Sequence, residues 1–171
     1  MQLTGVLGQR RALGQLDTEM AAGRLAHAYL FVGPAGSGRG TTALALFRAL
    51  NCQEHGARAC GQCPSCRRAA AGQHEDLIVL APPGDQASAQ IKVEELREMI
   101  RAISFTPFGG GTRLVLIRQA GQMNLNSANV LLKTLEEPPP GNILVLTVQD
   151  PGEILPTLVS RCRRVNFLPL E

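Results

Sequence analysis

A glycine-rich segment between an apolar run and a helix-forming stretch restricts the possible fold of this chain more than any other feature. Residues 28–32 read AYLFV, residues 33–40 read GPAGSGRG, and residues 42–50 favour a helix. The segment has the frame GxxxxGK followed by Ser or Thr, in which backbone N–H groups surround phosphate groups at the start of a helix. A plain glycine-rich turn is the alternative, but the strand and helix flanks favour a phosphate loop and predict one unit of a parallel sheet.

The same loop lacks groups that nucleotide hydrolysis requires. Arg39 stands at the lysine position, and Gly40 stands where a hydroxyl residue would bind Mg²⁺. Arginine is a poor substitute for lysine at a packed phosphate site, because its planar fork is longer and differently shaped. Thr41 follows one position late, where helical geometry turns its hydroxyl away from the metal. The candidate phosphate-binding residues therefore form a degenerate loop in which ATP binding is doubtful, and they are Gly33, Gly36, Gly38, Arg39, Gly40 and Thr41.

The second half of such a site is also altered. Hydrolysing enzymes place an Asp that holds Mg²⁺ and a Glu that prepares the attacking water after a later strand. In this chain the apolar run 114–117 is followed by Arg118 and Gln119. A positive charge at this position disfavours Mg²⁺. The two sets of losses together predict a phosphate-loop fold without catalysis.

Apolar runs alternate with helical stretches along the rest of the chain. Continuous apolar strands separated by helices are typical of a parallel sheet that is covered on both faces. We therefore predict one α/β domain over residues 1–171, with a parallel five-stranded sheet flanked by helices. The predicted strands span residues 28–32, 77–80, 114–117, 143–147 and, with a more polar sequence, 162–167, and the predicted helices span 6–22, 42–50, 93–102 and 127–136.

Four cysteines interrupt this alternation in a polar segment, residues 51–73, which we interpret as an inserted module. Four thiolates at these spacings suit tetrahedral, structural Zn²⁺ with no open position for water. Two disulfides, unligated cysteines and an iron–sulfur cluster are the weaker alternatives. The predicted ligands are Cys52, Cys60, Cys63 and Cys66.

Two histidines and one further cysteine are not needed as metal ligands. His55 and His74 lie near the four cysteines but exceed a complete ligand set, so we expect a surface or capping role for each. Cys162 stands alone and is predicted to be a small core residue.

Composition narrows the class of protein without identifying a partner. Hydrophobic residues make up 44% and charged residues 18% of the 171 residues, which excludes a disordered chain. The formal net charge of +3 permits contact with nucleic acid but does not argue for it. No secretory signal or membrane-length apolar run is present, so we expect a cytoplasmic protein with no membrane partner.

The motifs in their order resemble the bacterial DNA polymerase III clamp loader, a family of AAA+ proteins. Residues 128–139 read ANVLLKTLEEPP and residues 160–162 read SRC, after the phosphate loop and the four cysteines. Gamma/tau and delta-prime subunits share this order, and the resemblance covers nearly the whole chain. The altered phosphate loop and the missing acidic pair are similar to delta-prime, since gamma/tau subunits keep both.

This resemblance implies a fold, a role and a set of partners. It implies an AAA+ module with an embedded zinc module, followed by lid and collar domains that lie outside this sequence. It implies a non-hydrolysing subunit that works with gamma/tau and delta subunits to load the sliding clamp onto primer-template DNA. Arg161 would be an arginine finger acting in trans on a neighbouring ATP site, although a surface arginine is the alternative. The family's sensor position falls on Thr147 or Val148.

Two other functions remain open from the sequence. The first is an active gamma/tau-like AAA+ ATPase, which would need Arg39 and Gly40 to function despite the losses. The second is a zinc-dependent nucleic-acid-binding protein. The cysteine segment offers only Arg58, Arg67 and Arg68 as cations and has no aromatic residue for base stacking, which argues against this second function.

Overall fold

A parallel sheet of five strands forms the centre of the chain, in agreement with the predicted fold class. The structure is a computed structural model that describes residues 3, 5–54, 59–84 and 86–170. The strands lie in the order β2-β3-β4-β1-β5, and every paired neighbour runs parallel. The strands are β1 (Ala28–Val32), β2 (Leu77–Leu80), β3 (Arg113–Ile117), β4 (Asn142–Val148) and β5 (Arg163–Asn166).

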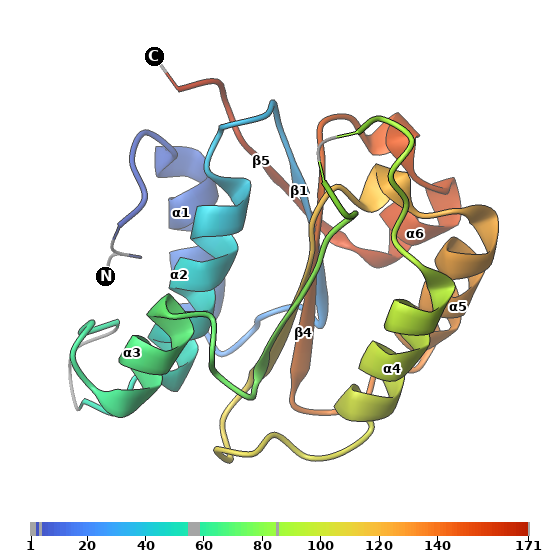
Figure 1. Ribbon diagram of the computed structural model, residues 1–171. Helices are drawn as coiled ribbons and strands as arrows, with labels where there is room; N and C mark the ends of the chain where they lie inside the picture. Colours follow the sequence, from blue (N-terminus) through green and yellow to red (C-terminus); the bar gives the residue numbers. More distant parts are fainter. Residues whose placement is uncertain (1–2, 4, 55–58, 85, 171) are drawn as a thin grey trace.

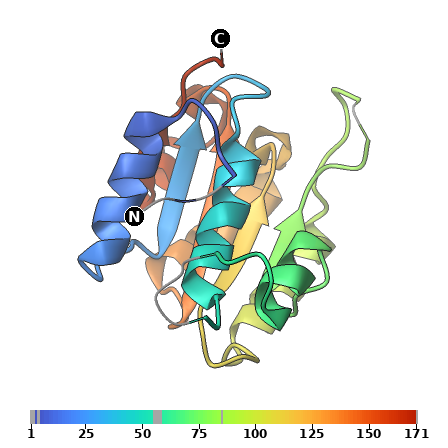
Figure 2. The same cartoon turned by 90° about the vertical axis from the view of Figure 1, so that its left-hand side faces the viewer.

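Helices cover both faces of this sheet (Figure 1). Figure 2 shows α1, α2 and α3 in front of one face. The helices on that face are α1 (Arg10–Ala21), α2 (Arg39–Asn51) and α3 (Pro64–Ala70), and those on the other are α4 (Val93–Ile103), α5 (Leu125–Glu136) and α6 (Pro156–Arg161). Two short 3-10 helices, η1 (Ala120–Gln122) and η2 (Pro151–Glu153), complete the described elements.

The strand sequences explain this layering. All residues of β1, β3 and β4 are buried, as expected for central strands that carry helices on both sides. Side chains alternate between two cores, so that Leu114 and Leu116 pack with α1 and α2 while Val115 and Ile117 pack with α4 and α5. Strand β5 is polar because it is an edge strand, and only Val165 of it is buried.

The parallel arrangement places three chain segments at one edge of the sheet. In register, Val32 of β1 pairs with Val148 of β4, and Ile117 of β3 pairs with Leu146. The segments that follow these strands therefore meet beyond their carboxyl ends, where open α/β sheets bind ligands. They are the phosphate loop, Arg118 with Gln119, and the residues after Thr147.

The start of the first helix and two short helices differ most from the sequence-based expectation. The first helix begins at Arg10 and not at residue 6, after the side chain of Gln9 binds the carbonyl groups of Ser37 and Leu168. Helices α3 and α6 were not predicted as helices, because seven and six residues are too few to show an apolar period. Both begin with proline at the first turn, which is the usual place for proline in a helix. No helix in the described part of the chain combines the length and apolar character needed to cross a bilayer.

Candidate functional site

The phosphate loop has the backbone of its motif because glycine occupies its restricted positions. Gly38 has φ of 87° immediately before α2, a left-handed conformation that other residues avoid. A Cβ at Gly33 would lie 2.6 Å from the carbonyl oxygen of Phe167, so the end of β5 packs directly against the end of β1. The first intrahelical hydrogen bond of α2 runs from Thr42 N to Gly38 O, at 2.8 Å. The N–H groups before it, from Arg39 to Thr41, are left for a ligand or solvent.

A cavity of about 450 Å³ lies over this loop. The structure brings together the predicted loop residues from Gly36 to Thr41, whereas Gly33 lies at the end of β1 outside the lining. Thr41 also lines the cavity, although its one-position displacement from the motif led us to expect its hydroxyl to turn away. The lining residues are Ala35, Gly36, Ser37, Gly38, Arg39, Gly40, Thr41, Arg118, Gln119, Thr147 and Gln149.

Arg39 is held at the rim of this cavity by the backbone of β4. Its Nη1 donates a hydrogen bond to the carbonyl oxygen of Val148, which also accepts from Gly33 N at 3.2 Å. Burial lowers the pKa of Arg39, and the nearby Glu153 carboxylate opposes this effect. The residue at the lysine position therefore ties the start of α2 to the end of β4.

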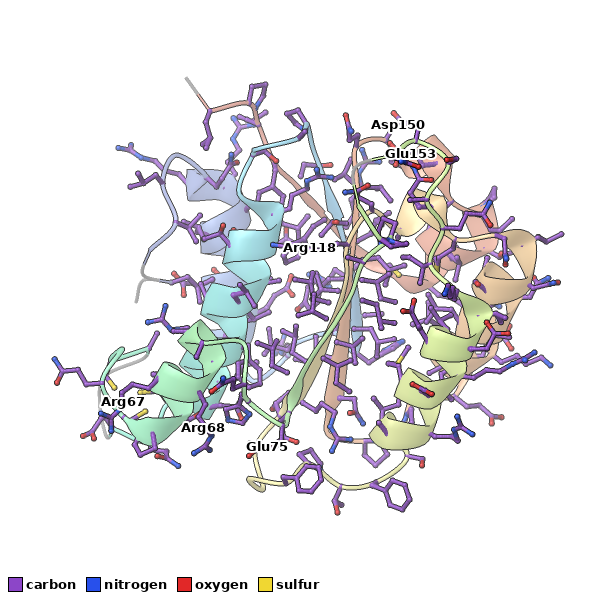
Figure 3. All side chains as sticks on the ribbon, viewed as in Figure 1. Arg67, Arg68, Glu75, Arg118, Asp150 and Glu153 are labelled. Carbon is purple, nitrogen blue, oxygen red and sulfur yellow. The ribbon has the colours of Figure 1, made fainter. Side chains whose placement is uncertain are left out.

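Arg118 lies over Gly40, the other altered position. A Cβ at Gly40 would be 2.9 Å from Arg118 Nη2 and 3.3 Å from its Nε. In Figure 3, Arg118 extends from the end of β3 toward α2. The guanidinium of Arg118 thus occupies the region where the motif places a hydroxyl and its metal. None of the described residues lining the cavity is a carboxylate, so the donor set does not fit Mg²⁺.

Of the two candidate sensor positions, Thr147 is the one that lines the cavity. Its Oγ1 accepts a hydrogen bond from Gln119 N at 3.1 Å, which joins the ends of β3 and β4. Val148 is buried, and only its carbonyl group reaches Arg39. Thr147 as a sensor stays a prediction.

Arg161 ends α6 and is not among the residues that line the cavity. Its Nη2 lies 3.0 Å from Oε1 of Glu136 at the end of α5, and its Nη1 donates to the carbonyl oxygen of Thr157 at 3.1 Å. The Arg161 side chain is 36% exposed and that of Glu136 is 46% exposed. A guanidinium in this position remains accessible from outside the chain.

The four predicted metal ligands lie together at the far end of α2 from the phosphate loop. Ligand atoms of Cys52, Cys60, Cys63 and Cys66 all lie within 4.8 Å of one another. Tetrahedral Zn²⁺ with Zn–S bonds of about 2.3 Å brings its sulfurs to similar spacings. N–H groups also point at the sulfurs, since Cys63 N donates to Cys60 Sγ at 3.3 Å and Cys66 N to Cys63 Sγ at 3.4 Å. The cluster fits a structural metal.

The thiols of this cluster have different environments. Burial raises the pKa of Cys66 to about 12. Burial also opposes ionisation of Cys63, but hydrogen bonds from the backbone of Gln53 and Cys66 and from the thiols of Cys66 and Cys60 together lower the pKa of Cys63 to about 6. A cation bound between the sulfurs would favour the thiolate form of all four.

The expectations for the remaining histidines and cysteine have different outcomes. Of the two roles expected for His74, the surface position is wrong, because its ring is buried edge-on against Phe47 of α2 and Nε2 lies 3.1 Å from Ser65 Oγ. The capping role agrees with the structure, since Nδ1 accepts a hydrogen bond from the backbone N–H of Asp76 at 3.1 Å. The other expected surface histidine, His55, and the cation Arg58 lie outside the described residues. Cys162 packs against the core between α6 and β5, and burial raises its pKa to about 12, as expected for a small core residue.

Sequence comparison assigns the chain to a family. Residues 8–171 match the family described as DNA polymerase III, delta subunit. A delta-prime subunit of DNA polymerase III from Pseudomonas aeruginosa is 43% identical over 138 residues, which cover 80% of this chain. The chain belongs to the DNA polymerase III delta-prime family. It spans 42% of the length of that Pseudomonas relative.

Other DNA polymerase III proteins are also similar to this delta-prime family member. The tau subunit of DNA polymerase III from Escherichia coli is 35% identical over 167 residues, or 97% of this chain and 25% of the tau subunit. A crystal structure of a DNA polymerase III gamma subunit-related protein from Thermotoga maritima has a TM-score of 0.63 at 21% identity. That alignment covers 89% of this chain and 45% of the other, and it supports the AAA+ fold.

Proposed function

We propose that this chain is the nucleotide-binding-type module of a non-hydrolysing delta-prime subunit. In a DNA polymerase III clamp loader, it would act with gamma/tau and delta subunits to place the sliding clamp on primer-template DNA. Arg161 would act in trans as an arginine finger on the ATP of an adjacent gamma/tau subunit. A Zn²⁺ ion held by the four cysteines would stabilise the inserted module.

The observation that carries this proposal is the contact between Arg118 and Gly40. Hydrolysis needs a hydroxyl and carboxylates that hold Mg²⁺, and a guanidinium fills the same region in this chain. A bound divalent cation would be repelled by Arg118 at short range in a partly enclosed cavity. The chain therefore lacks the means to use ATP itself while keeping an exposed Arg161.

The surroundings of Arg161 support a role outside its own cavity. Among the described residues, the side chain is held by Glu136 and by a backbone carbonyl, both at the surface. A guanidinium that reaches a neighbour's ATP would neutralise charge that develops on the transferred phosphoryl group. If Arg161 left Glu136 and bound phosphate oxygens instead, its guanidinium would be paired with a negative group in both positions.

The similarity to the Escherichia coli tau subunit favours an active ATPase as the second candidate. If it is correct, the purified chain should release phosphate from Mg²⁺-ATP faster than a mock-purified control, and Arg39→Ala should abolish this activity. The Arg118–Gly40 contact argues against it. The structure also argues against a zinc-dependent nucleic-acid-binding protein. Its candidate cations Arg67 and Arg68 lie on α3 (Figure 3), and Arg68 already pairs with Glu75 at 3.6 Å.

The proposed role is tested in a clamp loader reconstituted with the full-length subunit. DNA- and clamp-stimulated ATPase and clamp loading are measured for wild type, Arg161→Ala and the matched control Arg164→Ala on the exposed edge of β5. Loss of an arginine finger costs about 10³- to 10⁵-fold at the site it serves. We expect a smaller loss in the whole loader, because it has several ATP sites, and no loss for Arg164→Ala.

Assembly is checked first, by confirming that both variants enter the complex in equal amounts. If Arg161→Ala assembles normally and loads clamps at the wild-type rate, Arg161 is a surface arginine and the proposal is wrong.

A further inference from the structure

The four-cysteine cluster gathers more negative charge than a metal ion removes. Four thiolates around one Zn²⁺ leave an excess of negative charge, and Cys63 and Cys66 are buried, where water screens charge poorly. The position of the cluster adds to the difficulty. Cys52 directly follows the last residue of α2, and the negative end of a helix dipole disfavours an anion there. The cluster therefore requires compensating groups beside its sulfurs.

Backbone N–H groups supply part of this compensation. Cys60 N donates to Cys52 Sγ at 3.4 Å, and Gln62 N donates to Cys60 Sγ at 3.4 Å. A backbone hydrogen bond from Gly61 reaches the sulfur of Cys66. These groups are dipoles without net charge, so they stabilise thiolates but leave the excess charge unbalanced.

Arg48 is a cation that α2 places against the same loop. It lies in the last turn of the helix, four residues before Cys52, and residues at this spacing are neighbours on a helix surface. Its Nη2 would be 3.4 Å from a Cβ built on Gly61, so the guanidinium lies against the backbone that binds the Cys66 sulfur. Gly61 has φ of 76°, a conformation that favours glycine and leaves this approach open.

The guanidinium of Arg48 has no competing partner among the described residues. Its Nε is enclosed and lacks a hydrogen-bond partner there, and no ion pair in the described part of the chain includes it. An enclosed, unpaired cationic group costs free energy, which a nearby anion would offset. Arg68 of α3 differs in both respects, since it is exposed and pairs with Glu75 at 3.6 Å.

We propose that Arg48 is the counter-charge of the four-cysteine cluster and that it strengthens metal binding without being a ligand. This inference rests on the zinc site of the proposed function and adds a residue from α2 to it. Arg48 is a positioning residue, because it acts on the metal through the thiolates. Loss of such a partner outside the ligand set typically reduces metal affinity about 10- to 100-fold.

The test is competition for Zn²⁺ between the reduced whole chain and a chromophoric chelator. We expect Arg48→Gln to weaken zinc binding about 10- to 100-fold and Arg48→Lys, which keeps the charge, to regain most of the loss. Arg48→Met keeps the aliphatic stem without the charge and should behave like Arg48→Gln, so that a folding defect of one variant does not decide the outcome. The matched control Arg68→Gln removes an equal, exposed charge from the same module and should stay within about threefold of wild type.

Substitution of Co²⁺ for Zn²⁺ separates an effect of charge from an effect of packing. A nearby cation stabilises the filled sulfur orbitals, so its removal should move the thiolate-to-cobalt absorption band to longer wavelength. We expect this shift in Arg48→Gln and Arg48→Met, and bands close to wild type in Arg48→Lys and Arg68→Gln.

Two results would overturn this inference while leaving the zinc site in place. One is equal zinc affinity in wild type and Arg48→Gln. The other is an equal loss in Arg48→Gln and Arg48→Lys with an unchanged cobalt band, which would make Arg48 a packing residue. A wild-type chain that binds neither Zn²⁺ nor Co²⁺ would instead overturn the zinc site itself, and the inference with it.

Discussion

Nη2 of Arg113 lies 3.4 Å from Oδ1 of Asp76, and both side chains are almost completely buried. Arg113 also donates to the carbonyl oxygens of Ala102 and Phe105, at 2.7 and 2.9 Å. The carboxylate of Asp76 accepts from Phe108 N at 2.9 Å and from a second N–H beside it. The pair thus joins the start of β3 to the segment that connects it with α4.

Replacing Arg113 should be strongly destabilising. In Arg113→Met the Asp76 charge remains buried without its counterion, and we expect the free energy of unfolding to fall by about 3–5 kcal/mol. Urea denaturation followed by circular dichroism measures this change. Arg164→Met on the exposed edge strand is the control and should change stability by less than about 0.5 kcal/mol. Equal midpoints for the two variants would show that the ion pair contributes little.

The sequence predicted the sheet well but not this pair. Continuous apolar runs identify β1, β3 and β4, because central parallel strands are buried on both faces. The predicted strand began at residue 114, because it followed the apolar run, whereas β3 begins at Arg113. Its burial depends on Asp76, which is distant in the sequence, and no local pattern records that contact.

For the candidate site too, the sequence predicted the local motifs but not the contacts between distant residues. The glycine frame and the missing acidic residues indicated the altered loop, since both are local motifs. The contact of Arg118 with Gly40 and that of Arg161 with Glu136 join residues far apart in the sequence, and only the packed structure shows them. The surface alternative for His74 was wrong for the same reason, because Phe47 and Ser65 bury it from two other elements.

Restoring the hydroxyl of the phosphate loop should not restore hydrolysis. In Gly40→Thr the new side chain meets Arg118, and the positions of Arg118 and Gln119 still lack carboxylates. We expect no phosphate release from Mg²⁺-ATP above a mock-purified control. The comparison variant combines Gly40→Thr with Arg118→Asp and Gln119→Glu. Turnover by Gly40→Thr alone that Arg39→Ala abolishes would show that the altered loop is competent.

Stability should decrease in mild acid because of His74. Burial lowers the pKa of His74 below its ordinary value of 6.5, and Nδ1 must stay unprotonated to accept from Asp76 N. The unfolded chain takes up the proton first, so the contribution of His74 is complete above about pH 6.5 and is lost as the pH falls toward its folded pKa. Urea midpoints measured from pH 7.5 to 5.5 with saturating Zn²⁺ test this. His74→Gln should have a flatter profile, and identical slopes would contradict the assignment.

One equivalent of Zn²⁺ is expected per reduced, untagged chain. Cys63→Ser removes a buried ligand and should reduce the bound metal, whereas Cys162→Ser, outside the cluster, should leave it unchanged. Removing the metal with a chelator should lower the thermal midpoint, because the free energy of binding contributes to folding. Metal analysis with thiol titration decides the matter: four freely reactive thiols and no metal would exclude the site.

The contact between Arg161 and Glu136 should contribute little to stability. Both side chains are more than one-third exposed, and exposed ion pairs typically contribute about 0–1 kcal/mol. Glu136→Gln should therefore change the free energy of unfolding by less than about 1 kcal/mol. An arginine held this weakly can leave Glu136 for the phosphate oxygens of a neighbouring subunit. In a reconstituted loader we expect Glu136→Gln to keep near wild-type ATPase while Arg161→Gln reduces it. A loss of more than about 2 kcal/mol in both variants, with equal loss of loading, would instead make the pair a structural link between α5 and α6.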